Sequence, residues 1–181
     1  AMQDLGHAAR FRTHAKVIGI TGSVGKTGTK ELLAAAFGAL GQTHASKGSF
    51  NNHWGVPYTL AAMNPGTDYG IFEMGMNHAG ELLELGKQVR PHVAMITWIA
   101  PAHLEFFSGL EAIADAKSEI FENIESGGAA ILPTNAPQFD RLWANATKAE
   151  VERLIAFGWH ETAMDRLVDY KPGEAGARIH A

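Results

Sequence analysis

The stretch KVIGITGSVGKTGTKELL (residues 16–33) holds three features that determine the fold. KVIGIT (16–21) is a short apolar run typical of a buried strand, and TGTKELLAAAFGAL (27–40) is rich in helix-forming residues. The glycine-rich turn between them can form an anion cradle, because its backbone N–H groups and the helix N-terminus converge there. The stretch therefore predicts a P-loop nucleotide-binding domain.

Several residues of this turn are candidates for nucleotide binding. Lys26 can reach the β- and γ-phosphates of a nucleotide, and Thr27 can offer its hydroxyl to Mg²⁺. The match to G-x-x-x-x-G-K-[ST] is incomplete, because Ile20 occupies the position of the first glycine. The alternative is an ordinary strand–helix turn followed by a surface lysine. The candidate cofactor-binding residues of the turn are Gly22, Ser23, Gly25, Lys26, Thr27 and Gly28.

Outside this stretch, strand-like and helix-like patterns alternate along the chain. Apolar strand patterns occur at 69–74, 93–99, 129–134 and 153–158, and helical patterns at 79–89, 110–125 and 136–150. This alternation predicts an α/β fold, with a mostly parallel sheet and helices on both faces. Ligands in such folds bind at the carboxyl ends of the strands. Residues 1–15 are expected to form a helical or coil lead-in, and 165–181 two short strands around a Pro-Gly turn.

The bulk composition excludes several classes of partner. The 181 residues suffice for one domain, and 46% hydrophobic with 19% charged residues is ordinary for a globular chain. A net charge of −4 without a Lys/Arg cluster argues against nucleic-acid and anionic-membrane partners. The longest apolar run, VAMITWIA (93–100), is too short to span a bilayer. The chain has no cysteine, which fits a reducing cytoplasm, and its nine histidines show no zinc-site spacing.

Polar residues that could bind a ligand lie at the ends of two predicted strands and in one predicted loop. Glu73 ends the strand at 69–74, and His103 lies just beyond the strand at 93–99. At neighbouring carboxyl ends, both could face the phosphate loop and bind Mg²⁺ or its waters. Asn51 and Asn52 precede a helix expected at Pro57 and could hold phosphate or substrate. The alternatives are a solvated glutamate, a surface histidine and ordinary turn chemistry.

Lys117 interrupts an apolar stripe in the predicted helix EAIADAKSEIFENI (111–124). It lies seven residues from both Leu110 and Ile124, so helical periodicity places it in the middle of that stripe. One interpretation is that the stem packs while the ammonium reaches solvent. The other is that a buried lysine, with a lowered pKa, serves a chemical role.

These segments together resemble the central ATP-binding domain of the Mur ligases. The resemblance covers about residues 16–160 in the order of that family. Its blocks are TGSVGKTGTKE (21–31), NNHWGVPYTL (51–60), FEMGMNHAGEL (72–82), AHLEFFSGLEAIADAKSEIF (102–121), GGAAILPTNAP (127–137) and IAFGWH (155–160). The third and fourth blocks favour the members that add D-Ala-D-Ala to UDP-MurNAc-tripeptide.

The resemblance implies a role for each matching residue. ATP would bind with two Mg²⁺ ions, and the catalytic residues would be Lys26, His103 and Lys117. The metal residues would be Thr27, Glu73, His103 and Lys117, with Lys117 carbamylated. Asn52 would lie near the phosphates, and Asn135 and His160 near the adenine. Gly28 departs from the family pattern, which has Ser or Thr there.

The resemblance also sets expectations for the whole protein. Residues 1–15 would lead in from an N-terminal domain, and residues 16–181 would be a central domain incomplete at its C-terminus. The substrates would be UDP-MurNAc-tripeptide and D-Ala-D-Ala, joined through an acyl phosphate by a cytoplasmic, monomeric ligase. Alternatives are a folylpolyglutamate- or cyanophycin-type ligase, a P-loop kinase or NTPase, and a nucleotide-binding module without turnover.

Overall fold

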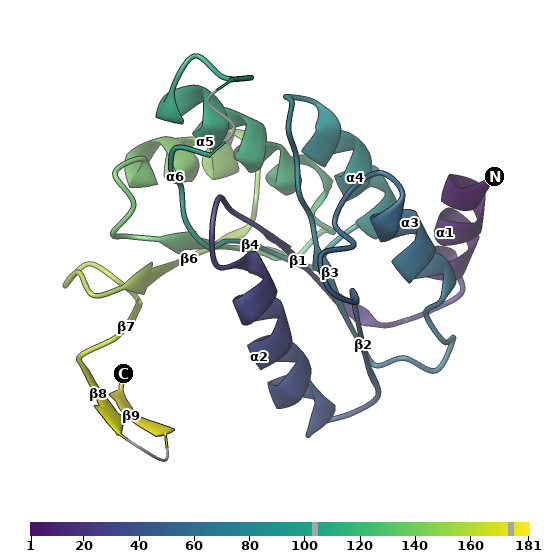
Figure 1. Ribbon diagram of the computed structural model, residues 1–181, viewed down its shortest axis with the longest axis horizontal. Helices are drawn as coiled ribbons and strands as arrows, with labels where there is room; N and C mark the ends of the chain where they lie inside the picture. The colour runs from purple at the N-terminus through teal and green to yellow at the C-terminus, as the bar shows by residue number, and fades with distance from the viewer. Residues whose placement is uncertain (103–104, 174–175) are drawn as a thin grey trace.

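A computed structural model describes residues 1–102, 105–173 and 176–181 of the chain (Figure 1). The strands are β1 (Lys16–Thr21), β2 (Thr43–Ala45), β3 (Tyr69–Glu73), β4 (Val93–Ile96), β5 (Ala129–Pro133), β6 (Arg153–Gly158), β7 (Asp165–Arg166), β8 (Asp169–Gly173) and β9 (Gly176–His180). The helices are α1 (Met2–Phe11), α2 (Lys26–Gly38), α3 (Gly55–Ala61), α4 (Glu81–Val89), α5 (Leu110–Ser118), the 3₁₀-helix η1 (Glu119–Asn123) and α6 (Phe139–Lys148). Among the described residues, no helix is both long and apolar enough to cross a membrane.

Seven strands form one sheet in the order β2-β3-β1-β4-β5-β6-β7, and every neighbouring pair is parallel. β1 lies inside this sheet, with Ile18 opposite Ile71 of β3 and Val93 of β4. The carboxyl ends of β1, β3 and β4 therefore meet at one edge, where loops carry the functional residues. The prediction of a mostly parallel α/β sheet is confirmed.

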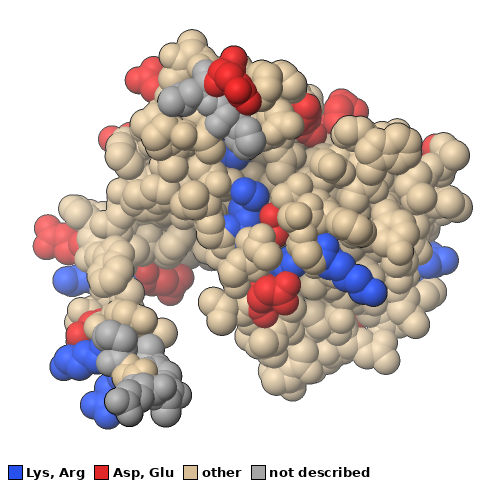
Figure 2. Space-filling view, in the orientation of Figure 1, with Lys and Arg blue, Asp and Glu red and all other residues tan. Residues whose placement is uncertain are grey.

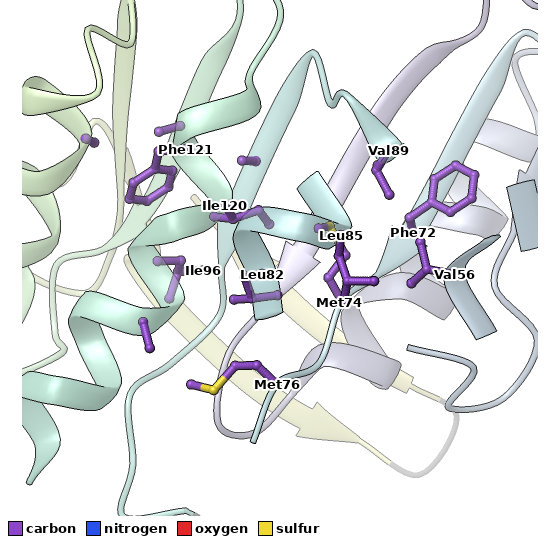
Figure 3. Close-up of a cluster of buried hydrophobic side chains, with 14 of the residues drawn as sticks. Val56, Phe72, Met74, Met76, Leu82, Leu85, Val89, Ile96, Ile120 and Phe121 are labelled. Atoms are coloured by element: carbon purple, nitrogen blue, oxygen red, sulfur yellow. The ribbon is translucent and has the colours of Figure 1, made fainter. Parts of the chain in front are cut away.

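The two faces of the sheet are covered very unequally. α3, α4, α5 and α6 contribute to the larger apolar cluster on one face, and Figure 3 shows Phe72 of β3, Leu85 of α4 and Phe121 of η1 within it. On the other face, Leu33, Ala34 and Phe37 of α2 pack against Ile18, Ile20 and Ile71. In Figure 1, α2 lies below the sheet and α4, α5 and α6 lie above it. Helices on both faces were expected, and α2 is the one described helix on its side.

Tertiary contacts shift several element boundaries. β4 ends at Ile96 and not at residue 99, because the next residue, Thr97, turns to the phosphate loop. The helix expected at 110–125 changes to 3₁₀ geometry after Ser118, whose hydroxyl donates to the Ala114 carbonyl at 2.8 Å. A side chain that bonds four residues back commonly disturbs a helix. β2 was not predicted, since three residues are too few for a clear pattern.

The lead-in of residues 1–15 is part of the folded body. It contains α1, which packs on α3 and α4. The Arg10 guanidinium is buried and donates to the carbonyls of Val89 (2.8 Å) and Arg90 (2.9 Å) at the end of α4. At the other end of the chain, the tail forms the two predicted short strands, β8 and β9, which pair antiparallel with each other.

Candidate functional site

The phosphate loop joins β1 to α2 and owes its shape to two glycines. Gly25 has φ 85°, and Gly22 has φ 149° with no room for a side chain, since a Cβ there would collide with Thr97 Oγ1. Gly28 differs, because a Cβ at this position would meet no atom within 4 Å. Glycine is therefore required at positions 22 and 25. The backbone does not require it at Gly28, the position that departs from the family pattern.

Thr97, which follows β4, fixes the loop from beneath. Its hydroxyl donates to the Val24 carbonyl at 2.6 Å, and its N–H donates to the Thr21 carbonyl at 2.9 Å. Ser23 is held in the same way, with its N–H on the Trp98 carbonyl (2.8 Å) and its hydroxyl on the Ala100 carbonyl (3.0 Å). Sequence reasoning missed Thr97. Its one signal was that of a polar residue within an apolar run.

Lys26 begins α2 and turns back over the loop. Its ammonium donates to the Gly22 carbonyl at 2.7 Å. Burial lowers the pKa of Lys26, and the nearby Glu73 carboxylate partly offsets that effect. The ammonium thus lies at the loop whose N–H groups and helix N-terminus favour an anion.

Thr27, Glu73 and Asn51 come together at the carboxyl end of β3. The Thr27 hydroxyl donates to Glu73 Oε2 at 2.9 Å, and Asn51 Nδ2 donates to Glu73 Oε1 at 2.8 Å. Glu73 is 1% exposed, so the alternative interpretation, in which it is a solvated glutamate at the end of a strand, is wrong. No group of three His, Asp or Glu side chains able to hold a metal occurs within the described ranges. The hard oxygen donors here are the Thr27 hydroxyl and the Glu73 carboxylate.

Lys117 lies in the last turn of α5 and points into the same cavity as the phosphate loop. Its side chain is 3% exposed, so the interpretation that its ammonium reaches solvent is wrong. Burial, and secondly the positive charge of Lys26, lower the pKa of Lys117 to about 7. Near neutral pH, a large fraction of this side chain is therefore a neutral amine.

The cavity has a volume of about 720 Å³ and is lined by the phosphate loop, residues 51–53 and 75–77, the start of α4, Gln3 of α1 and Lys117. Figure 2 shows basic side chains close to an acidic one near the centre of this face, above α2 in the same view. The cavity therefore combines residues of an anion cradle, Asn51, which bonds to Glu73, and a second, buried lysine.

The remaining predicted residues lie in different surroundings. Asn52 lines the cavity, but its Oδ1 accepts the N–H groups of Trp54 (3.1 Å) and Gly55 (2.9 Å), so the amide oxygen organises the start of α3. Its neighbour Asn51 is the one that touches Glu73. His103 falls outside the described residues.

Asn135 follows β5 and His160 follows the neighbouring strand β6, and neither lines the cavity that contains Lys26 and Lys117. Asn135 Oδ1 accepts the N–H of Trp159 at 2.7 Å. His160 Nδ1 lies 2.8 Å from the Thr162 hydroxyl. Both residues thus follow neighbouring strands, and neither lines the cavity of the phosphate loop.

Comparisons with known proteins agree with this geometry. Residues 20–180 match the family profile described as Mur ligase middle domain. The UDP-N-acetylmuramoyl-tripeptide–D-alanyl-D-alanine ligase of Rickettsia prowazekii (strain Madrid E) is 40% identical over 180 residues, which cover 99% of this chain and 40% of that protein.

Two solved structures have the same architecture. MurF from Acinetobacter baumannii superposes with a TM-score of 0.88 at 32% identity, covering 98% of this chain and 41% of that one. MurF from Thermotoga maritima, solved in complex with ADP, gives a TM-score of 0.81 at 26% identity, with 98% and 41% covered. The chain spans about two fifths of the length of these relatives. The match over nearly its whole length shows that the chain belongs to the Mur ligase family and corresponds to the middle domain.

Proposed function

We propose that this chain is the ATP- and Mg²⁺-binding domain of a ligase that adds D-Ala-D-Ala to UDP-MurNAc-tripeptide in peptidoglycan synthesis. The observation that carries the proposal is the contact between Thr27 of the phosphate loop and buried Glu73. Asn51, which bonds to Glu73, lines one cavity with Lys26 and Lys117. The name of the Rickettsia relative supports the choice of substrates over a folylpolyglutamate-type ligase. Because this chemistry consumes ATP, we assign it to the cytoplasm.

The residues of the site fit a magnesium nucleotide. The phosphates would lie on the backbone N–H groups of residues 22–27, with the Lys26 ammonium against the β- and γ-phosphates. Thr27 and Glu73 supply the hydroxyl and carboxylate oxygens that Mg²⁺ prefers, and both are already oriented toward each other. We assign the adenine to the side of Asn135 and His160, as the family resemblance implies. The metal, when bound, neutralises charge on the transferring phosphoryl group.

The reaction proposed has two steps. The terminal carboxylate of the tripeptide attacks the γ-phosphorus, the bond to the bridging oxygen breaks, and ADP leaves with an acyl phosphate formed. The amine of D-Ala-D-Ala then attacks the acyl carbon, loses a proton and expels inorganic phosphate. Lys26 contributes by holding the phosphates and balancing their charge, since positioning and electrostatics dominate phosphoryl transfer.

Lys117 is proposed to act as a carbamate. A neutral lysine amine adds CO₂ and releases a proton, which gives an N-carboxylate anion, and the pKa of about 7 makes the neutral amine available. With His103, this anion would serve a second Mg²⁺ site. The product also removes the unfavourable juxtaposition of two ammonium groups, Lys117 and Lys26.

Calorimetric titration with Mg-ATP tests the nucleotide site. We expect Lys26→Ala to abolish measurable binding without unfolding the domain, because the cation against the phosphates is lost. Lys16→Ala is the matched control, since Lys16 is exposed and begins the strand whose other end carries the loop. Equal affinity of Lys26→Ala and wild type would move the nucleotide site elsewhere.

A further inference from the structure

Lys30 is the largest fully buried side chain of the described residues, with an exposure of 0%. It lies on α2, one turn after Lys26, and it does not line the cavity of the phosphate loop. Burying an ammonium is costly unless hydrogen bonds and a counter-charge compensate. A buried ammonium is therefore expected to bind the groups around it firmly and to fix their positions.

Three oxygen atoms surround the Lys30 ammonium. Nζ donates to the carbonyls of Ser46 (2.7 Å) and Gly48 (2.8 Å), and it lies 2.8 Å from the Glu31 carboxylate, which is largely exposed. Two hydrogen bonds and one ion pair thus offset the cost of burying this charge. Two of the three acceptors belong to the segment that follows β2.

This segment, residues 46–51, lies alongside the carboxyl end of β3. Ser46 donates its N–H to the Ile71 carbonyl (3.1 Å), and its hydroxyl accepts the N–H of Glu73 (3.3 Å). Five residues later, the Asn51 carbonyl accepts the N–H of Gly75 at 2.7 Å. The segment thus spans the backbone on both sides of Glu73 and presents the Asn51 amide to the Glu73 carboxylate.

We propose that Lys30 is a positioning residue for the magnesium site. It anchors segment 46–51 to α2, and the anchored segment places Asn51 so that the Glu73 carboxylate faces Thr27. α2 then carries Lys26 and Thr27 on one turn and the anchor of the loop on the next, so phosphate and metal ligands share one rigid support. The inference rests on the proposed binding of a magnesium nucleotide.

The test separates metal affinity from nucleotide affinity. ADP binding is measured in EDTA and then across a Mg²⁺ titration, for wild type, Lys30→Met, Asn51→Ala and the double variant. For Lys30→Met we expect a rise of about tenfold in the Mg²⁺ concentration that gives half of the maximal change in ADP affinity. The ADP affinity without metal should change less than about twofold. Asn51→Ala should give the same pattern, and the double variant should add little to either single one.

Glu31→Gln is the matched control, because it keeps an oxygen beside Lys30 and leaves both carbonyl contacts in place. Its Mg²⁺ requirement should equal that of wild type. Equal losses of metal-free and metal-dependent affinity in Lys30→Met would indicate general destabilisation and overturn the proposal. An unchanged Mg²⁺ requirement in Asn51→Ala would overturn it as well, even if Lys30→Met fails to fold.

Amide hydrogen exchange tests the anchor without any nucleotide. The Gly75 N–H, which bonds to Asn51, should exchange faster in Lys30→Met, or in the polar variant Lys30→Gln, than in Glu31→Gln. Unchanged exchange would overturn the anchor. Absent ADP binding by wild type, with faster exchange in the variant, would instead overturn the proposed function and leave the anchor standing.

Discussion

Lys117 owes its chemistry to its surroundings. The same residue type on the surface of a helix would remain a cation at neutral pH, whereas burial beside Lys26 brings the pKa of Lys117 to about 7. The sequence indicated this position through the apolar stripe on both sides of the lysine. The direction of the side chain, toward the phosphate loop, is a property of the packed fold.

The lowered pKa makes stability depend on pH. Between about pH 7 and 10.5, Lys117 binds fewer protons in the folded than in the unfolded state, so the free energy of unfolding rises with pH across this window. Relative to Lys117→Met, we expect wild type to gain on the order of 4 kcal/mol from pH 7 to pH 10.5. Urea denaturation in CO₂-free buffers measures the difference, and parallel pH profiles of the two proteins would contradict it.

Two glycines of the phosphate loop should respond oppositely to the same substitution. Gly22→Ala should lower the free energy of unfolding by about 2 kcal/mol or more, because the new Cβ meets Thr97 Oγ1 at a positive φ. Gly28→Ala should raise it by about 0.5–1 kcal/mol, since Gly28 lies in α2 with open space around it. Chemical denaturation of both variants checks this, and a similar effect at both positions would be inconsistent with the loop geometry.

Elements were predictable where local pattern decides them, and less so where distant contacts do. β1 and α2 follow from residues 16–40 alone, because a strand, a glycine turn and a helix each have local signals. The early end of β4 depends on bonds from Thr97 to Thr21 and Val24, which no local pattern encodes. The same limit applies to the site: Lys26 and Thr27 were found by motif, whereas the contact of Asn51 with Glu73 requires the folded chain.

α1 is expected to contribute to the stability of the domain through Arg10. Arg10→Met should lower the free energy of unfolding by about 2 kcal/mol, because the buried carbonyls of Val89 and Arg90 lose their donor. Arg12→Met is the control, since Arg12 is exposed and bonds to the Met63 carbonyl at the end of α3. We expect less than half the loss there. Thermal denaturation compares the two, and equal losses would argue against a special role for α1.

At the scale of the whole molecule, the chain contains the cavity to which we assign the nucleotide and spans about two fifths of the related ligases. Catalysis of amide formation needs the carboxylate, the amine and the phosphates to be held together. In the proposed function, the residues of this chain are assigned to the phosphates and the metal.

Residues 1–181 by themselves should therefore form no amide bond from UDP-MurNAc-tripeptide and D-Ala-D-Ala. We expect Mg-ATP binding to persist, with ATP hydrolysis slow or undetectable, because the chain spans only about two fifths of the related ligases. Chromatographic detection of product and a phosphate-release assay measure both reactions. Ligation at a rate comparable with that of a full-length relative would show that this domain suffices.

The position of β1 inside the sheet has a consequence for synthesis of the protein. Lys16 pairs with Tyr69 and Ile18 with Val93, so both neighbours of β1 leave the ribosome long after β1 itself. At about 5–20 residues per second, the nascent strand waits on the order of seconds before its second partner exists. Throughout that time the edge of β1 that pairs with β4 has no partner strand. The strand that carries the phosphate loop is thus synthesised early and completes its pairing late. We therefore expect the nascent chain to be most prone to aggregation before β4 has been synthesised.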